Sequence, residues 1–590
     1  MKLKIKRALL VLLAGAMLLT ALAGCGGDTS STADGSESTG SASEGSTASG
    51  ETSNEEYRIN VLVGSSSVDS SDETYIGQLI KEKFNVVFDY EIYAGDMVEK
   101  TNLQLAGGDY GDIVNVQWDN NVVNWIDAGA VIALDDLMAE YGADFAALHE
   151  EEIPLWRMAG SDGKLYKWET AAGLTEGTNV LNDVWIRSDV LEALGWPKLV
   201  SSDDWIEAIR KGKELFPTTE EGVQTEGICI PFGESWGMSL TQIFNEKGGL
   251  SGALGGTDSA QWDPVNEEYV DMVTDYMKEN LKFYNTLWRE GLMDPESFSM
   301  DTNNMTEKMN TGIPIAIYYS GWGASGANRN LETLGRADQT YVPMPIQSPS
   351  QYENNEPRNL GVWHSNAINS WMITDNAKDP ARIMQVLNWF ATEEGLNALG
   401  WGEEGVHYTV EEDGTKVPTQ EFIDLYNAGG EEYDKIGFNS FPFSGAPDKT
   451  TTTQNGQYFS ITLDPEVVRA SYSERELEVL DQYGLETFVD MWHGAFVESE
   501  LRDYYFVSPA ATIPVENDLA RTEEKVVQSR NEYAVKMIQA SSDEEFEQLW
   551  EEMLQAHEEL GAAEVIQFKN DQLAEMEAEY NAMESSDSAE

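Results

Sequence analysis

The sequence predicts an α/β fold in which parallel strands alternate with helices. Three short strand patterns, at 57–63, 86–90 and 112–116, are separated by helical patterns at 74–84 and 96–106. This strand–helix–strand–helix–strand order is typical of a sheet with helices packed against it. In sheets of this kind, ligands bind beyond the carboxyl ends of the strands.

Each of these elements has a local signal of its own. The first strand, YRINVLV, alternates apolar and polar residues and ends at a glycine. The first helix carries apolar side chains on one face, at Ile76, Leu79, Ile80 and Phe84. The second helix ends at Gly107 and Gly108. The third strand, DIVNV, is short and mostly apolar, which indicates a buried strand, and Trp118 stands just past its end.

The N-terminus has the pattern of an export signal. Four cations within residues 2–7 precede an apolar stretch at 8–23, which is shorter than the roughly 18 to 20 residues that span a bilayer. Ala23 and Gly24 stand before Cys25 and resemble the bacterial lipobox, in which the cysteine is acylated and the chain is cut before it. We therefore expect a lipoprotein signal peptide at 1–24 and a lipid anchor at Cys25, the alternative being an ordinary secretory signal.

Polar segments flank the main body of the chain. Residues 25–56 are nearly all Gly, Ser, Thr, Glu, Asp and Ala, with no aromatic residue. Such a segment buries too little apolar surface to fold, so we expect a flexible linker. Residues 581–590 predict a disordered tail, and the body at about 57–580 is long enough for more than one domain.

The charge of the chain excludes some classes of partner. The formal net charge is −67, and loss of the four signal cations would make it more negative still. A balance so negative argues against nucleic acid and against anionic membrane surfaces as partners. Acidic surface charge also keeps a protein soluble, so it does not by itself indicate a cationic ligand.

No recognised catalytic motif emerges from the sequence. The five histidines lack metal-ligand spacing, and the chain has no G-x-S-x-G elbow, P-loop or dinucleotide fingerprint. Carboxylate pairs are too abundant among 104 acidic residues to indicate a glycoside hydrolase. Cys229, in the apolar run GICIP, predicts a buried core residue, because no second cysteine remains for a disulfide once Cys25 is acylated. We expect no enzyme activity and no cofactor.

Seven segments of the body carry a family pattern. They are Leu103–Val114, Ala128–Leu137, Asp162–Tyr166, Trp185–Gly195, Asp203–Trp205, Leu281–Glu296 and Ser542–Met576. Their residues and their order resemble the extracellular solute-binding proteins of ABC sugar importers, and most of all the large lipoprotein members of Gram-positive bacteria.

The resemblance implies two α/β lobes of the type II periplasmic-binding-protein-like fold, with a ligand cleft at the hinge. Each lobe would be a sheet flanked by helices. By the order of the motifs, one lobe takes 57–183 and 355–415, and the other takes 184–354 and 416–580. Residues 402–510 exceed what a minimal member needs, so we expect them to contain a loop-rich insertion near the cleft rim.

The resemblance also implies a function. The protein would be a lipid-anchored monomer on the extracellular face of the membrane, which captures an oligosaccharide and delivers it to the permease subunits of an ABC transporter. Two alternatives stay open: a peptide or amino-sugar receptor of the same fold, and a surface glycoside hydrolase.

A sugar cleft needs flat apolar platforms and planar polar side chains, because a pyranose has an apolar face ringed by hydroxyls. Trp322 follows the predicted strand 313–317 at a glycine-flanked turn, where the resemblance places an aromatic platform. The other candidates also follow strands or lie in loops: Trp118, Asp119, Asn120, Trp168, Glu169, Trp236, Trp363 and His364. Each of these has a core position as its alternative.

Four further tryptophans, Trp205, Trp288, Trp389 and Trp550, lie in helical patterns, and we expect them to pack in the core. Residues 216–222 occupy the place where some relatives carry a calcium loop. The alternating carboxylates of such a loop are missing here, so we expect no metal at that turn.

Overall fold

The structure is a computed structural model of the chain. It describes residues 55–93, 97–117, 119–160, 162–169, 184–234, 236–247, 250–252, 259–263, 265–318, 321–354, 369–449, 451–453, 456–492, 510, 512–514 and 517–587. The predicted signal peptide 1–24, the anchor at Cys25 and nearly all of the linker 25–56 lie outside the described residues.

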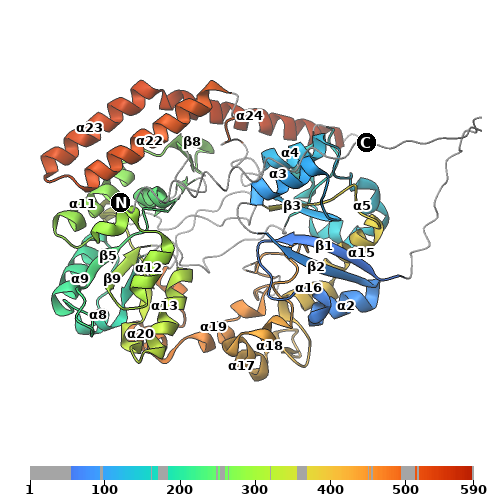
Figure 1. The fold of residues 1–590 in the computed structure, drawn as a ribbon, viewed down its shortest axis with the longest axis horizontal. Helices are drawn as coiled ribbons and strands as arrows, with labels where there is room; N and C mark the ends of the chain where they lie inside the picture. Colours follow the sequence, from blue (N-terminus) through green and yellow to red (C-terminus); the bar gives the residue numbers. More distant parts are fainter. Residues whose placement is uncertain are drawn as a thin grey trace, which may run out of the picture. The chain divides into compact units, whose positions relative to one another are not determined.

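The first sheet has the strand order β11-β3-β1-β2 (Figure 1). Its strands are β1 (Tyr57–Val63), β2 (Val86–Ile92), β3 (Ile113–Gln117) and β11 (Asn369–Ile373). The strand β1 is parallel to β2 and to β3, while β11 returns antiparallel to β3. The connecting helices are α2 (Tyr75–Phe84) and α3 (Met97–Gly107). The predicted alternation of strands and helices is confirmed, with bounds shifted by at most two residues.

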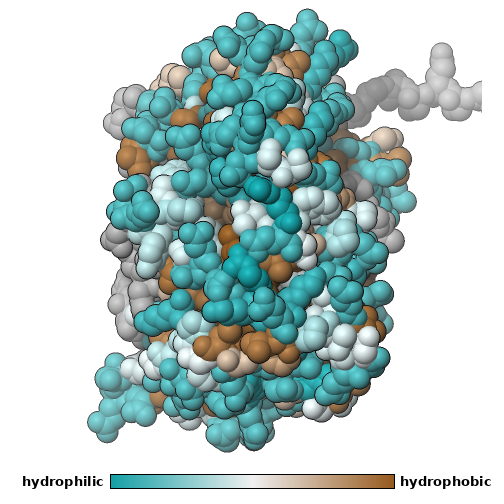
Figure 2. All heavy atoms as spheres, turned by 90° about the vertical axis from the view of Figure 1, so that its left-hand side faces the viewer, coloured by the Kyte–Doolittle hydropathy of each residue, from teal (hydrophilic) through white to brown (hydrophobic). Residues whose placement is uncertain are grey.

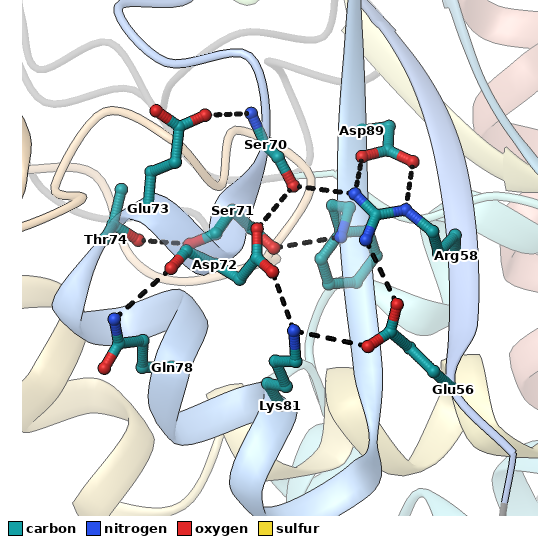
Figure 3. A network of polar contacts seen from close by, with 11 residues as sticks. Glu56, Arg58, Ser70, Ser71, Asp72, Glu73, Thr74, Gln78, Lys81 and Asp89 are labelled. Atoms are coloured by element: carbon teal, nitrogen blue, oxygen red, sulfur yellow. Dashed lines mark hydrogen bonds and ion pairs between the residues drawn. The ribbon is translucent and has the colours of Figure 1, made fainter.

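Polar side chains hold the beginning of this sheet in place (Figure 3). Arg58 Nε on β1 donates to Asp89 Oδ2 on β2 at 2.8 Å. Lys81 Nζ on α2 lies 2.7 Å from Asp72 Oδ2 and 3.2 Å from Glu56 Oε2. These exposed and half-exposed pairs fix where the folded body begins and contribute little stability each.

The core of the first sheet is formed by helices from both predicted segments of this lobe. They are α4 (Asp119–Asp127), α5 (Asp135–Tyr141), α6 (Ala143–Leu148), α7 (Ile153–Trp156), α15 (Pro380–Phe390) and α16 (Glu393–Trp401), with the 3₁₀ turns η1 (Ser71–Glu73) and η2 (Arg157–Ala159). Phe145, Trp156 and Trp389 are buried in this core.

The second sheet has the order β10-β4-β9-β5. Its strands are β4 (Val184–Arg187), β5 (Glu226–Cys229), β9 (Pro314–Tyr318) and β10 (Tyr341–Met344). Here β5 and β9 are parallel, whereas β4 is antiparallel to both of its neighbours. The carboxyl ends of β9 and β10 therefore meet the beginning of β4.

Helices surround the second sheet and complete its core. They are α8 (Ser188–Ala193), α9 (Ser202–Leu215), α10 (Ile243–Lys247), α11 (Asp275–Arg289), α12 (Thr302–Met309), α13 (Gly321–Thr333), α14 (Pro349–Asn354), α22 (Asp518–Ile538) and α23 (Asp543–Leu560), with η3 (Gly237–Gln242), η4 (Pro295–Ser299) and η5 (Ala337–Gln339). Trp205, Trp288 and Trp550 pack in this core, and Trp389 packs in the first, so the packing role predicted for all four is confirmed.

A small antiparallel sheet and the C-terminal helix extend the first core, to which Ala260, Trp262, Tyr269 and Leu573 belong. The sheet consists of β6 (Ser251–Gly252), β7 (Ala260–Asp263) and β8 (Glu268–Asp271), and α24 (Ala562–Asp587) packs on β8. The predicted disordered tail at 581–590 is corrected, because α24 continues to Asp587. Its last turns are rich in Ala, Glu and Met, which favour the helix.

The described part of the predicted loop-rich insertion at 402–510 consists of short helices and one hairpin, joined by irregular segments that hold more than half of its described residues. It contains β12 (Tyr408–Val410), β13 (Lys416–Pro418), α17 (Gln420–Ala428), α18 (Glu431–Asp434), α19 (Pro465–Ser471), α20 (Glu474–Tyr483), η6 (Ile461–Leu463) and η7 (Phe488–Trp492). Trp401, at the end of α16, forms a small core with Tyr408, Phe422, Ile436, Ile461 and Val467 of this segment. These apolar side chains bury one another and so hold the short elements together.

The lobe boundary predicted at 415/416 also needs correction. Phe441 and Phe443 are buried in the core of the first sheet, and Tyr75 N donates to Lys435 O at 2.7 Å. Residues 435–446 therefore pack with the first lobe, because their aromatic side chains complete its core. The boundaries at 183/184 and 354/355 adjoin segments outside the described residues and stay predictions.

The surface agrees with the acidic composition. Figure 2 shows one face on which hydrophilic residues predominate and hydrophobic side chains are scattered between them. Within the part of the chain that the structure describes, no helix is both long enough and apolar enough to cross a bilayer.

Candidate ligand-binding site

The carboxyl ends of the strands are where the sequence predicts the ligand. In the first sheet, β3 ends at Gln117 opposite Asn369, the first residue of β11. In the second sheet, β9 ends at Tyr318 opposite Val184, the first residue of β4. The candidate residues fall on the segments that adjoin these edges.

Trp168 and Glu169 belong to the first core. Trp168 exchanges two backbone hydrogen bonds with Trp371, of 3.0 and 2.9 Å, and so adds a short strand beside β11. Its side chain is 0% exposed, and its indole N–H donates to Phe443 O at 2.8 Å. The structure therefore places this predicted platform inside the core, where protein covers both faces of the ring.

Glu169 takes part in a buried polar cluster with Lys167 and Ser370. Lys167 Nζ lies 2.8 Å from Glu169 Oε1, and Ser370 Oγ donates to the same oxygen at 2.9 Å. All three side chains are almost completely buried. A buried charge is tolerated when it is paired and hydrogen-bonded, so this cluster fastens residues 167–169 to β11.

Trp236 is half-buried and stands in a turn after β5. Phe232 stacks on Phe298 with an interplanar angle of 19°, and Glu234 Oε1 accepts the N–H of Thr302 at 2.8 Å. Gly237 lets the chain double back here, because a Cβ at that position would lie 2.3 Å from the carbonyl oxygen of Pro231. These contacts hold Trp236 at the beginning of η3.

A groove of about 810 Å³ lies between η3 and α22, which is one of the three helices along the top of Figure 1. Its lining residues are Met238 on η3 and, on α22, Ala520, Glu523, Glu524, Val527, Gln528, Asn531, Glu532 and Val535. The α22 residues recur at steps of three and four, which is one face of a helix. Val527, Val535 and Met238 give it an apolar surface.

The polar lining of this groove suits a ligand that carries hydroxyl groups. Gln528 and Asn531 offer amide donors and acceptors, and Glu524 and Glu532 offer acceptors. None of these groove residues was predicted from the sequence. The three- and four-residue spacing was visible, but such a stripe indicates packing as readily as binding until the partner surface is known.

The remaining candidates are only partly described. Trp322 lies in the first turn of α13, so the predicted glycine turn is instead the beginning of a helix; its side chain is outside the described residues. Asp119 and Asn120 begin α4, and their side chains are likewise outside. Trp118, Trp363 and His364 lie wholly outside the described residues.

The turn that replaces a calcium loop is occupied by a cation of the chain itself. Glu221 pairs with Arg336, and Glu220 Oε2 lies 3.6 Å from Arg336 Nε. Arg336 also donates to the carbonyl oxygen of Thr311 at 3.3 Å. Among the described residues, no group of His, Cys, Asp and Glu is arranged to hold a metal ion.

The predicted core position of Cys229 is confirmed. Its side chain is 0% exposed on β5, and Sγ donates to Asp294 Oδ2 at 3.3 Å. Burial raises the pKa of the Cys229 thiol, and the neighbouring Asp294 carboxylate adds to that rise. The thiol is therefore protonated and inaccessible, as a structural cysteine is.

Comparison with known proteins assigns the family. Residues 70–396 match the model of the bacterial extracellular solute-binding proteins. The chain belongs to this family. Its members are solute-binding proteins and not enzymes, and they act outside the cytoplasm.

One curated relative is the fructooligosaccharide ABC transporter substrate-binding protein FusA of Streptococcus pneumoniae. The two chains are 28% identical over 308 residues, which is 49% of this chain and 55% of the relative. The match thus spans about half the length of that relative.

Solved structures of solute-binding proteins share the fold. A FusA variant in complex with fructo-nystose aligns with a TM-score of 0.57 and 17% identity, over 88% of this chain and 100% of that one. An HMO-binding protein from Bifidobacterium longum infantis gives 0.58 and 12%, over 88% and 98%. The alginate-binding protein AlgQ2 gives 0.53 and 14%, over 89% and 99%. The predicted two-lobe α/β fold is thereby confirmed.

Proposed function

We propose that this protein captures a neutral oligosaccharide between its two lobes and delivers it to the permease of an ABC transporter. The observation that supports this most is the family match on a body with two separate sheets and cores. The named ligands of the similar proteins, fructooligosaccharide and alginate, are carbohydrates. The protein would release its ligand unchanged.

The residues in this proposal differ in their expected role and in whether the structure describes their side chains. In the second lobe, Trp236 and the groove between η3 and α22 offer an aromatic ring, an apolar surface and planar polar groups. Trp322, Trp118, Asp119, Asn120, Trp363 and His364 remain proposed contacts. Trp168 and Glu169 would act behind the site, through the buried cluster that fastens β11. A ligand that touches both lobes only in the closed form shifts the population toward closure.

The charge of the protein narrows the ligand class. The chain carries a formal charge of −67, which includes three glutamates of the groove lining, Glu524, Glu532 and the Lys569-paired Glu523. An anionic saccharide would be repelled at low ionic strength, whereas a neutral one would not. We therefore place fructooligosaccharides ahead of alginate fragments as the ligand.

The anchor is the second part of the proposal. Acylation at Cys25 would tether the body to the outer face of the membrane through the linker 25–56. Replacement of Cys25 by serine should release the protein into the medium, and mass spectrometry should find two acyl chains on the wild type only. Retention of the serine variant on the membrane would contradict the anchor.

The binding experiment uses the soluble protein from residue 26 onward. Isothermal titration calorimetry would measure kestose, a neutral glucan fragment, an alginate oligosaccharide and a tripeptide. We expect heat from a neutral saccharide and a rise in thermal stability with its concentration. Binding of the peptide alone, with an affinity that falls with salt, would replace the proposal by the peptide receptor. Release of new reducing ends would replace it by a hydrolase.

A further inference from the structure

The C-terminal helix α24 contacts three separate parts of the molecule. It packs on β8, on α22 and on α7. Figure 1 shows α24 continuing from the pair of helices α22 and α23, above β8. Two consecutive residues of α24 make polar contacts with different partners, Lys569 with Glu523 of α22 and Asn570 with Tyr269 of β8.

Lys569 is buried and carries its charge to the wall of the groove. Its side chain is 0% exposed, and Nζ lies 2.8 Å from Glu523 Oε1. Ser259 Oγ donates to the same oxygen at 3.1 Å. Glu523 is itself a lining residue of the groove. Because a buried ammonium must keep its carboxylate partner, this pair fixes the turn of α22 that carries Glu523.

The Asn570 side chain joins α24 to β8 through the two backbone groups of Tyr269, which a neighbouring strand would otherwise bind. Tyr269 N donates to Asn570 Oδ1 at 2.7 Å, and Asn570 Nδ2 donates back to Tyr269 O at 3.0 Å. The edge strand β8 thus has both backbone groups of Tyr269 satisfied by one side chain. Both hydrogen bonds require Asn570 to face Tyr269, so they fix the position of α24 along β8.

Apolar residues along α24 belong to the first core. Leu573 is 5% exposed in that core, and Ile566, Met576 and Tyr580 pack against it. The helix consequently joins the first core by apolar contacts and by Asn570, and it joins the groove wall by Lys569. Hydrogen bonds require a defined geometry, whereas apolar contacts are non-directional and allow small shifts of the helix.

We propose that Lys569 is a positioning residue for the ligand groove, which holds the Glu523 turn of α22 in the place that the ligand needs, while Asn570 sets the position of α24 on β8. This inference rests on the proposed function, because it assigns the groove to ligand binding. Lys569 also lies outside residues 70–396, the part of the chain that matches the family model.

The test compares three variants of the complete soluble chain. Lys569→Met removes the charge and keeps the length, Lys569→Arg keeps the charge, and Lys525→Met is the matched control, since Lys525 is an exposed residue of α22 outside the groove lining. Hydrogen exchange of the α22 amides is measured without ligand, and kestose affinity is measured by calorimetry well below the melting temperature. Ser259→Ala is a milder variant if Lys569→Met does not fold.

We expect Lys569→Met to speed exchange in α22 but not in α23, and to weaken kestose binding by about tenfold or more. Lys569→Arg should restore both, and Lys525→Met should change neither. Unchanged exchange in α22, or a lower melting temperature with unchanged kestose affinity, would overturn the inference. If the wild type binds no kestose, the proposed ligand is wrong, while the exchange experiment still decides whether Lys569 positions α22.

Discussion

Two strand-end regions that look alike in the sequence differ in the structure. Trp168 and Glu169 precede a crossing between the lobes, and Trp236 follows β5 into a glycine turn. In the first region both side chains are buried and bonded. In the second region Trp236 is half-buried, packs against the second core and lies two residues before Met238, which lines the groove.

The difference comes from what the backbone does after the strand. Residues around Trp168 pair with β11, so successive side chains point to opposite faces of a covered sheet and both are buried. At Trp236 the chain has left the sheet and turns back at Gly237. The two tryptophans therefore differ in burial because one is paired with a neighbouring strand and the other lies in a turn.

The largest effect should follow from Trp168→Ala. The substitution opens a cavity in the first core and removes the hydrogen bond to Phe443 O. We expect a loss of about 3 to 5 kcal/mol in the free energy of unfolding. Denaturant unfolding monitored by circular dichroism measures it. A loss below 1 kcal/mol, together with weaker ligand binding, would show that Trp168 contacts the ligand and that the two regions do not differ in this way.

Lys167→Met tests the buried cluster of the same region. It removes the ammonium group 2.8 Å from the wholly buried Glu169. Removal of one partner of a buried ion pair costs about 3 to 5 kcal/mol, so the melting temperature should fall clearly. Lys164→Met is the control, because Lys164 forms only an exposed pair with Asp162. Equal stability of the two variants would show that the cluster contributes nothing.

Trp236→Ala and Trp322→Ala test the second region. Loss of an aromatic platform should weaken oligosaccharide binding by about 1 to 3 kcal/mol, with little change in unfolding. Calorimetry measures the affinity, and the melting temperature controls for folding. If either variant lost stability and kept its affinity, that tryptophan would be a packing residue like Trp168.

The local elements of the first sheet could be predicted because each has its own signal. The strand 57–63 alternates, and the helix 75–84 carries an apolar face and begins at Thr74, whose side chain accepts the N–H of Gly77. Trp205 and Trp550 were assigned to the core by the same periodicity. Such signals depend on neighbours within one turn or one strand, which a sequence displays directly.

The site could be predicted only in part because its parts come from distant segments. Met238 and the α22 stripe are almost three hundred residues apart, and nothing in either segment indicates the other. The same holds for Trp168, which is buried by Trp371 and Phe443. The small core beside α16 was not predicted for the same reason, since it joins residues as far apart as Trp401 and Val467.

The smallest expected effect is a pH dependence of local stability in the insertion 402–510. This effect tests whether the small core there unfolds separately from the cores of both sheets. His407 is buried between Tyr75 and Phe422, and its Nδ1 accepts the N–H of Glu403 at 2.8 Å. Burial lowers the pKa of His407 below its usual value of about 6.5, against a smaller opposing effect of Glu403.

A lowered pKa makes the unfolded state bind more protons than the folded state once the pH falls below about 6.5. The contribution of His407 to stability is therefore complete above that pH and decreases as the pH falls, by at most about 1.4 kcal/mol for each pH unit. Hydrogen exchange of residues 403–428 at pH 7.5 and 5.5 should show faster opening at the lower pH. His407→Asn keeps an acceptor but cannot titrate, so its exchange should lose this dependence. If the first sheet opened at low pH together with the insertion, the insertion would be part of the first core and not a separate region.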